Sequence, residues 1–208
     1  YLGILAAGAV AVPLDAGSLA RRVADIVRFV DARAVVVSER TRALAPADGA
    51  AAVLVEELTE RLGRERARDA GLPVPVPAEQ PASILFTSGT TLDPKGVMLP
   101  HRALLANAAS IAELIEPTPA DRLVSVLPLH HAFEFTAGCL TPLLGGASVT
   151  YLETVSSQSI VDAMRETRAT VLLGVPRLFE LMLEGIERQV AELKGSAGAA
   201  LGALRGTS

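Results

Sequence analysis

The sequence predicts an α/β protein with parallel-type sheets flanked by helices, and three observations lead to this prediction. Apolar runs of strand length alternate with segments whose apolar residues recur at helical spacing. Glycines and prolines separate many of these runs. The chain has 208 residues, 50% of them hydrophobic, so it can bury a sizeable core. Such alternation is typical of βα units, in which helices pack on the faces of a sheet.

The first part of the chain contains strand and helix candidates in turn. Residues 10–14 form a short apolar run that is expected to be a strand. Ser18 is the expected N-cap of an amphipathic helix over residues 19–32. Three consecutive valines within residues 32–39 predict a buried strand. A further strand and a charged helix are expected over residues 51–55 and 56–70.

A proline-rich segment, residues 71–83, interrupts this pattern. Its prolines stand at positions 73, 75, 77 and 81, and proline at alternate positions cannot join a central strand. We therefore expect extended loop and a boundary there, between a first α/β portion, residues 1–78, and a second α/β portion, residues 79–208.

The second portion repeats the alternation. A strand over residues 83–86 leads into a polar run, and a helix is expected directly after it, over residues 97–115. The pair Gly145-Gly146 is expected to end a later helix. The remaining candidates are strands over 122–129, 148–153 and 170–176 and helices over 132–144, 159–169 and 177–194.

The polar run, FTSGTTLDPKGV over residues 86–97, is the part of the sequence that points to chemistry. Ligands of open α/β sheets bind beyond the carboxyl ends of strands, and glycines let the backbone approach an anion closely. Lys95 adds a mobile positive charge. The run therefore predicts phosphate binding by its glycines, hydroxyls, amides and lysine: Thr87, Ser88, Gly89, Thr90, Thr91, Lys95 and Gly96.

Two other interpretations of this run are a surface turn and a nucleoside-triphosphatase P-loop. Asp93-Pro94 and the glycines also suit a plain surface turn, and composition alone does not separate the two. The P-loop of nucleoside triphosphatases is excluded, because it requires a serine or threonine directly after its lysine. Here Gly96 follows Lys95.

Composition and single residues exclude several function classes. The net charge of -4 and the 3% of aromatic residues, with no tryptophan, argue against a nucleic-acid partner. Cys139 is the single cysteine, so no internal disulfide forms, and its apolar neighbours favour a small core residue over a nucleophile. The apolar start lacks a basic segment and ends at Pro13, which argues against a signal peptide or a membrane span.

All three histidines, His101, His130 and His131, follow the polar run. A pair of adjacent histidines at a strand end points to opposite sides, and no acidic residue or cysteine stands at zinc-like spacing. No metal site is therefore predicted from protein side chains.

The segment TSGTTLDPKGV resembles the phosphate-loop signature of the adenylate-forming (AMP-binding) superfamily. It departs from that signature at Leu92, where the family has glycine. LPLHHAFE, residues 127–134, and GVPRLFE, residues 174–180, resemble the long-chain fatty acyl-CoA synthetase branch. The resemblance covers nearly the whole chain and implies an internal part of the large N-terminal domain of such an enzyme. The loop positions that match are Thr87, Ser88, Gly89, Thr90, Thr91, Pro94, Lys95 and Gly96.

This resemblance implies a reaction in two steps. A fatty acid carboxylate attacks the α-phosphorus of ATP to give acyl-AMP and pyrophosphate, and the thiol of coenzyme A then takes the acyl group. ATP, Mg²⁺ and coenzyme A are the implied cofactors, with the coenzyme A site largely outside this chain. The family's later motifs and its mobile C-terminal domain are not in the sequence, so we expect the chain alone not to complete the reaction.

Site residues beyond the loop are also implied by the resemblance. His131 matches a catalytic-site histidine at the edge of the acyl pocket, with a half-buried helix cap as the alternative. Phe133, Gly138 and residues 173–176 would border the acyl space, with ordinary core packing as the alternative. His101 is expected to be structural.

Two other functions remained open. The first alternative is a fatty acyl-AMP ligase or acyl-carrier-protein synthetase, which passes the acyl group to a different thiol. The chain is also consistent with a non-catalytic remnant that binds without turning over. A cytoplasmic location without an integral membrane segment is expected, and peripheral membrane association would suit fatty acid substrates.

Overall fold

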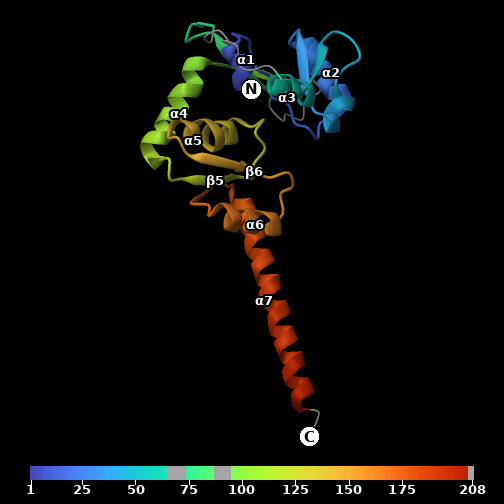
Figure 1. The fold of residues 1–208 in the computed structure, drawn as a ribbon, viewed down its shortest axis with the longest axis vertical. Helices are drawn as coiled ribbons and strands as arrows, with labels where there is room; N and C mark the ends of the chain where they lie inside the picture. The colour runs from blue at the N-terminus through green and yellow to red at the C-terminus, as the bar shows by residue number, and fades with distance from the viewer. Residues whose placement is uncertain (65–73, 87–94, 206–208) are drawn as a thin grey trace. The chain divides into compact units, whose positions relative to one another are not determined.

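The computed structural model of the protein describes residues 1–64, 74–86 and 95–205. Two compact units can be distinguished, residues 1–106 and residues 107–208 (Figure 1). The α/β prediction is confirmed, because both units combine strands with helices. The boundary expected between residues 78 and 79 is a different partition and stays a prediction.

The first unit contains two small sheets. The elements of the unit are α1 (Leu2–Ala6), α2 (Ala20–Phe29), β1 (Ala34–Val37), η1 (Glu39–Leu44), β2 (Ala51–Leu54), α3 (Val55–Arg64), β3 (Pro81–Phe86), β4 (Gly96–Pro100) and the start of α4 (His101–Ile115). Strands β1 and β2 are parallel, whereas β3 and β4 are antiparallel. The buried face of α2 is formed by Val23, Ile26 and Val27, at the spacing expected of an amphipathic helix.

Two residues of the proline-rich segment, Val74 and Ser83, are hydrogen-bonded to the start of the chain within this unit. Ala11 bridges Ser83 of β3 in parallel, and the fully buried Ser83 hydroxyl donates to the Ala11 carbonyl at 3.1 Å. Val74 N–H donates to Ala6 O at 2.9 Å. These bonds fix the course of the chain into β3, the strand that precedes the polar run.

Three local predictions for the first unit were wrong. Residues 10–14 make one isolated bridge in place of a strand, because Pro13 removes a donor from the ladder. Helix α2 is capped by Leu19 without a side-chain bond, since Ser18 belongs to a turn in which its N–H bonds the Asp15 carbonyl. Residues 97–99 continue strand β4 in place of a helix. Pro100 disfavours helical backbone at the residue before it, so α4 begins only at His101.

The second unit is a parallel three-stranded sheet covered by helices on both faces (Figure 1). The strand order is β6-β5-β7. The elements are β5 (Arg122–Ser125), the π-helix η2 (Glu134–Leu140), α5 (Thr141–Leu144), β6 (Ser148–Tyr151), α6 (Ser157–Thr167), β7 (Val171–Leu172) and α7 (Pro176–Arg205), after the end of α4.

Alternation along β5 assigns its residues to the two faces. Val124 packs with Ile160 of α6 and Leu178 of α7 in the main hydrophobic core. Ser125 points the other way, toward η2, whose Glu134 it contacts. The predicted helix stop is confirmed, because Gly145 caps α5 and Gly146 follows with a φ of 73°.

Candidate functional site

The polar run connects two antiparallel strands and does not lead into a helix. Phe86 ends β3 and pairs with Gly96, the first residue of β4. Thr87, Ser88, Gly89, Thr90 and Thr91 lie outside the described residues, so their role in phosphate binding stays a prediction. The strand–loop–helix expectation is wrong here.

The described end of the run consists of Lys95 and Gly96. Lys95 is exposed, and none of the ion pairs among the described residues involves it. A Cβ on Gly96 would lie 2.8 Å from Cγ2 of Ile84 and 3.2 Å from the Phe86 ring. Glycine is therefore required by close packing across the hairpin, and the run retains one exposed cation that is suited to an anionic ligand.

The base of the hairpin is held in place by its neighbours in the first unit. Phe86 packs edge-on against Phe29 at the end of α2, with ring centroids 6.0 Å apart. His101 N–H donates to Gln80 O at 3.1 Å, and its buried Nε2 has no hydrogen-bond partner among the described residues. These contacts agree with a structural role for His101, which remains a prediction.

His131 lies in a turn between β5 and η2, in the second unit. Its ring centroid is 4.3 Å from that of His130, with the two planes tilted by 44°. The expectation that the two rings point apart is wrong, because these residues are in a turn and not on a strand. His131 is exposed, its N–H donates to Pro128 O at 3.0 Å, and its carbonyl accepts from Phe135 N–H at 3.0 Å.

The other residues expected to border the acyl space differ in their surroundings. Phe133 is 51% exposed, beside the exposed His131. Gly138 is buried inside η2. Residues 173–175 connect β7 to α7, which begins at Pro176, and a Cβ on Gly174 would lie 2.8 Å from Leu178. Phe133 and His131 are thus both exposed, while Gly138 and Gly174 are in tight packing; their roles at an acyl site stay predictions.

Glu134 is a buried residue that the sequence analysis missed. Its side chain is fully enclosed, and Ser125 Oγ donates a hydrogen bond to Oε1. The other oxygen, Oε2, has no hydrogen-bond partner among the described residues. Burial raises the pKa of Glu134, and the bond from Ser125 only partly opposes this. The signal in the sequence was one carboxylate within the apolar run AFEFTAGCL.

Helix η2 has π winding, and threonine hydroxyls bond backbone carbonyls in and around it. Thr136 Oγ1 donates to Ala132 O at 2.7 Å. Thr141 Oγ1 lies 2.9 Å from Thr136 O and 3.3 Å from Ala108 O of α4. Short π segments are rare and occur frequently at functional sites. Together with the buried Glu134, this winding makes the β5–η2 corner a candidate functional feature of the chain.

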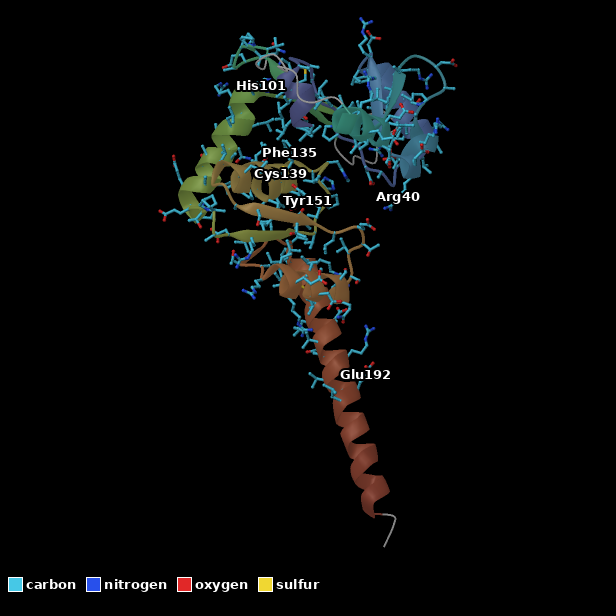
Figure 2. The ribbon with its side chains drawn as sticks, in the orientation of Figure 1. Arg40, His101, Phe135, Cys139, Tyr151 and Glu192 are labelled. Atoms are coloured by element: carbon cyan, nitrogen blue, oxygen red, sulfur yellow. The ribbon has the colours of Figure 1, made fainter. Side chains whose placement is uncertain are left out.

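Cys139 and Tyr151 lie on neighbouring elements of this unit, η2 and β6 (Figure 2). Burial, followed by the nearby Cys139 thiol and the Glu134 carboxyl, raises the pKa of Tyr151 well above its usual value. Cys139 itself is half-buried, which suits the packing role expected of it.

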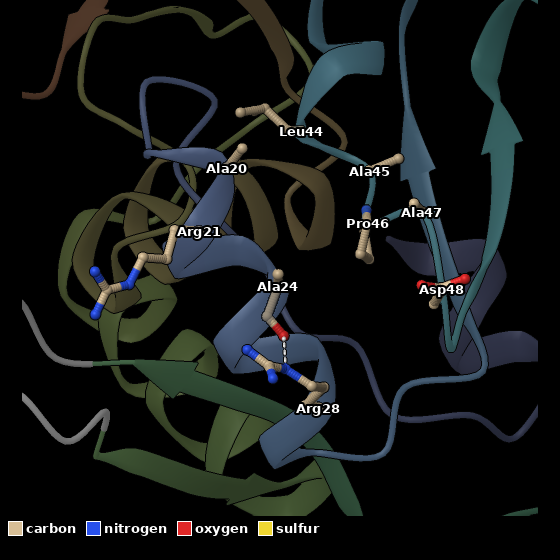
Figure 3. A pocket seen from close by; sticks show the side chains of 9 residues that line it. All are labelled: Ala20, Arg21, Ala24, Arg28, Leu44, Ala45, Pro46, Ala47 and Asp48. Carbon is tan, nitrogen blue, oxygen red and sulfur yellow. Dashed lines mark hydrogen bonds between the residues drawn. The ribbon is translucent and has the colours of Figure 1, made fainter.

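A shallow hollow of about 440 Å³ in the first unit is separate from the predicted site residues (Figure 3). Arg28 at its edge already pairs with Asp25 at 2.5 Å and donates to Ala24 O at 3.3 Å. The lining residues are Ala20, Arg21, Ala24, Arg28, Leu44, Ala45, Pro46, Ala47 and Asp48. This hollow therefore offers few polar groups that are free to bind a ligand.

Within the described ranges, no three His, Cys, Asp or Glu side chains come together as a metal-binding group. None of the described helices is long and apolar enough to cross a membrane.

Comparison with known proteins decides the family. The model of the AMP-binding enzyme family matches residues 1–206. The chain belongs to the AMP-binding enzyme family. The resemblance seen in the phosphate-loop signature is thereby confirmed.

Relatives within the family include several ligases. The chain is 34% identical over 137 residues to a probable CoA ligase of Humulus lupulus, covering 61% of this chain and 23% of the relative. It is 34% identical over 146 residues to long-chain-fatty-acid–CoA ligase 4 of Saccharomyces cerevisiae, covering 67% of this chain and 21% of the relative. The chain thus spans less than a quarter of these relatives.

Solved structures of the family share this fold. Apo MatB from Rhodopseudomonas palustris matches with a TM-score of 0.76 and 28% identity, over 88% of this chain and 37% of that chain. The inhibitor-bound N-terminal domain of FACL13 from Mycobacterium tuberculosis matches with a TM-score of 0.74 and 25% identity, over 86% and 47%. The α/β architecture is therefore that of the N-terminal domain of adenylate-forming enzymes.

Proposed function

We propose that this chain is part of an AMP-forming ligase that activates a fatty acid with ATP and transfers the acyl group from acyl-AMP to coenzyme A. Membership of the family and the long-chain ligase among the relatives support the reaction class. Solved relatives include an ATP-bound form of MatB and a malonyl-CoA ligase with methylmalonyl-CoA and AMP bound. Both ATP and a CoA thioester are thus ligands of related proteins.

The choice of a fatty acid rests on one observation in the second unit. Between Arg122 and Arg165 the sequence contains no lysine or arginine. A dicarboxylate such as malonate would find no fixed positive charge along this stretch for its second carboxylate. The same stretch exposes Leu129 and Phe133, at 39% and 51%, beside His131. An apolar acyl chain fits this corner better than a second carboxylate does.

The polar run would hold the ATP phosphates. Lys95 is exposed and free of carboxylate partners among the described residues, so its charge is available to a phosphate oxygen. Holding the β- and γ-phosphates would orient the α-phosphorus toward the fatty acid carboxylate and stabilise the departing pyrophosphate. Mg²⁺, when bound, would neutralise part of the phosphate charge. We place the protein in the cytoplasm, with peripheral membrane association as part of this proposal.

Calorimetric titration of the 208-residue chain with ATP, with and without Mg²⁺, tests the nucleotide part. A charge-assisted hydrogen bond contributes about 1.5–3 kcal/mol, so Lys95→Ala is expected to weaken ATP binding roughly 10- to 150-fold. Arg40→Ala is the matched control, because it removes one exposed positive charge elsewhere in the same unit (Figure 2). Equal losses in both variants would contradict a specific role for Lys95.

Titration with laurate and with malonate tests the acid. We expect binding of laurate, the C12 fatty acid, and none of malonate at the same concentration. A preference for malonate would refute the fatty acid assignment without affecting the nucleotide result.

A further inference from the structure

Glu134 is an acidic residue that is buried, and the proposed reaction does not explain its burial. Its side chain has 0% exposure, although acidic side chains are almost never fully buried without a partner. One carboxyl oxygen accepts from Ser125, and the other has no hydrogen-bond partner among the described residues. Burying a polar group costs free energy unless it is hydrogen-bonded, so the burial of Glu134 needs an explanation.

The hydrogen bond between Ser125 and Glu134 closes a turn. Ser125 is the last residue of β5, Glu134 is the first of η2, and nine positions separate them. The segment between them, residues 126–133, is called here the histidine turn. Its backbone carries the bond from His131 N–H to Pro128 O. The carboxyl of Glu134 therefore joins the end of the histidine turn to the strand on which it starts.

Contact with the next turn of η2 holds the same carboxyl from another side. A Cβ on Gly138 would lie 2.6 Å from Cδ and 2.9 Å from Oε2 of Glu134. The side chain thus lies against the bare backbone of Gly138 while it reaches Ser125. Two different elements, β5 and η2, fix its position.

The histidine turn has exposed side chains, whereas Glu134, which anchors the turn, is buried. His131 is exposed, and Phe133 is 51% exposed, directly before the fully buried Glu134. The turn therefore presents an imidazole and an aromatic ring to the outside from a base that is fixed in the interior. Such an arrangement orients side chains that a ligand would touch, through a residue that the ligand does not touch.

We propose that Glu134 is a positioning residue, whose hydrogen-bonded carboxyl sets the direction of the His131 and Phe133 side chains at the acyl site. The description of that site as an acyl site rests on the proposed function. The positioning itself depends only on the bonds of Glu134. Glutamine has nearly the same shape as glutamate and keeps a side-chain oxygen that can accept from Ser125, so its amide can replace the carboxyl.

The test uses NMR of the 208-residue chain with ¹³C-labelled histidine, since the sequence has only three histidines. Glu134→Ala and Ser125→Ala are each expected to shift or broaden the ring signals of His130 and His131. The double variant is expected to show the same shifts as either single variant, because one bond is lost in all three. Glu134→Gln is expected to keep the parent signals. His101, in the other compact unit, is the internal reference.

Two results would overturn the proposal. The first is unchanged signals of His130 and His131 in folded Glu134→Ala; if that variant does not fold, unchanged signals in Ser125→Ala decide in the same way. The second is a Glu134→Gln variant whose shifts equal those of the alanine variant. Laurate added to the parent chain is a separate arm: a His131 signal that does not respond counts against the acyl site, and the variant shifts still test the positioning.

Discussion

The contact between Glu134 and Gly138 makes a prediction that can be worked out from the structure. In Gly138→Ala, the new Cβ would meet the carboxyl of Glu134, with 2.6 Å to Cδ and 2.9 Å to Oε2. These distances are far below ordinary van der Waals contact. Because Glu134 is fully buried, its side chain cannot swing into solvent to relieve the overlap.

Three terms set the expected magnitude. Overpacking in a well-packed interior costs about 1–3 kcal/mol. Displacing Glu134 from Ser125 costs about 0.5–1.5 kcal/mol for the lost hydrogen bond. Alanine in a helix interior is better than glycine by about 1 kcal/mol, which offsets part of this. We expect Gly138→Ala to lower the free energy of unfolding by about 2 kcal/mol.

A double-mutant cycle with Glu134→Ala isolates the contact. In that background Gly138→Ala has nothing to collide with, so it is expected to be neutral or to stabilise by up to about 1 kcal/mol. The coupling is then about 2–3 kcal/mol. Urea unfolding followed by far-UV circular dichroism is the assay, because the chain contains no tryptophan.

Gly3→Ala in α1 is the matched control, since no atom lies within 4 Å of its added Cβ. It is expected to have no destabilising effect. Strictly additive effects of Gly138→Ala and Glu134→Ala would refute the argument from packing.

Three further predictions concern the pH dependence of stability, the N-cap of α6 and the polar run. The pKa of Glu134 is raised in the folded chain, so the unfolded chain releases this proton at lower pH and the free energy of unfolding should fall as pH rises above about 4.5. Glu134→Gln should remove this part of the pH dependence. Tyr151 and Cys139 are the neighbouring titratable groups. Ser156→Ala should cost about 1 kcal/mol in urea unfolding, because Ser156 Oγ accepts from Ser159 N–H at 3.1 Å in the capping box of α6. Leu92→Gly in a full-length context should raise the rate of pyrophosphate exchange, because the family signature has glycine at this position and a non-glycine residue costs about 1–2 kcal/mol wherever the backbone requires a positive φ; a rate equal to that of the parent would count against it.

The sequence predicted best those elements whose pattern does not depend on distant partners. The amphipathic spacing of α2 identified both the helix and its buried face. The valines of β1 identified a strand, but the expectation that this strand is buried was wrong, because only Val37 of β1 is buried and Val36 is 48% exposed. The stop at Gly145-Gly146 was also predicted, since Gly146 takes a positive φ that other residues adopt with difficulty.

Predictions failed where a local pattern suited two structures. The run Val97–Leu99 is apolar enough for either a helix or a strand, and pairing with β3 together with Pro100 decides for the strand. The histidine pair was assigned to a strand end, but β5 stops at Ser125 and the pair lies in a turn. Pairing with β3 contributed to the first case, and the second depended on where β5 ends, which the apolar pattern of the sequence alone did not show.

The candidate site was predictable as a motif and not as a packing arrangement. The signature over residues 87–96 identified the family, because so many of its positions are fixed by one chemical task. Glu134 escaped notice because its burial depends on Ser125, nine residues earlier, and on the bare backbone of Gly138. Such a three-residue arrangement leaves no periodic signal.

The winding of η2 has a consequence for how this corner can change. An α-helix advances about 100° around its axis with each residue, so removing one residue from the wide turn would restore regular winding and rotate everything before it by roughly that angle. His131 and Phe133 would then be directed elsewhere, although no residue facing the sheet would have been replaced. A family member with one residue more or fewer in this helix would therefore direct these two side chains differently toward a substrate, even if all its other residues were the same.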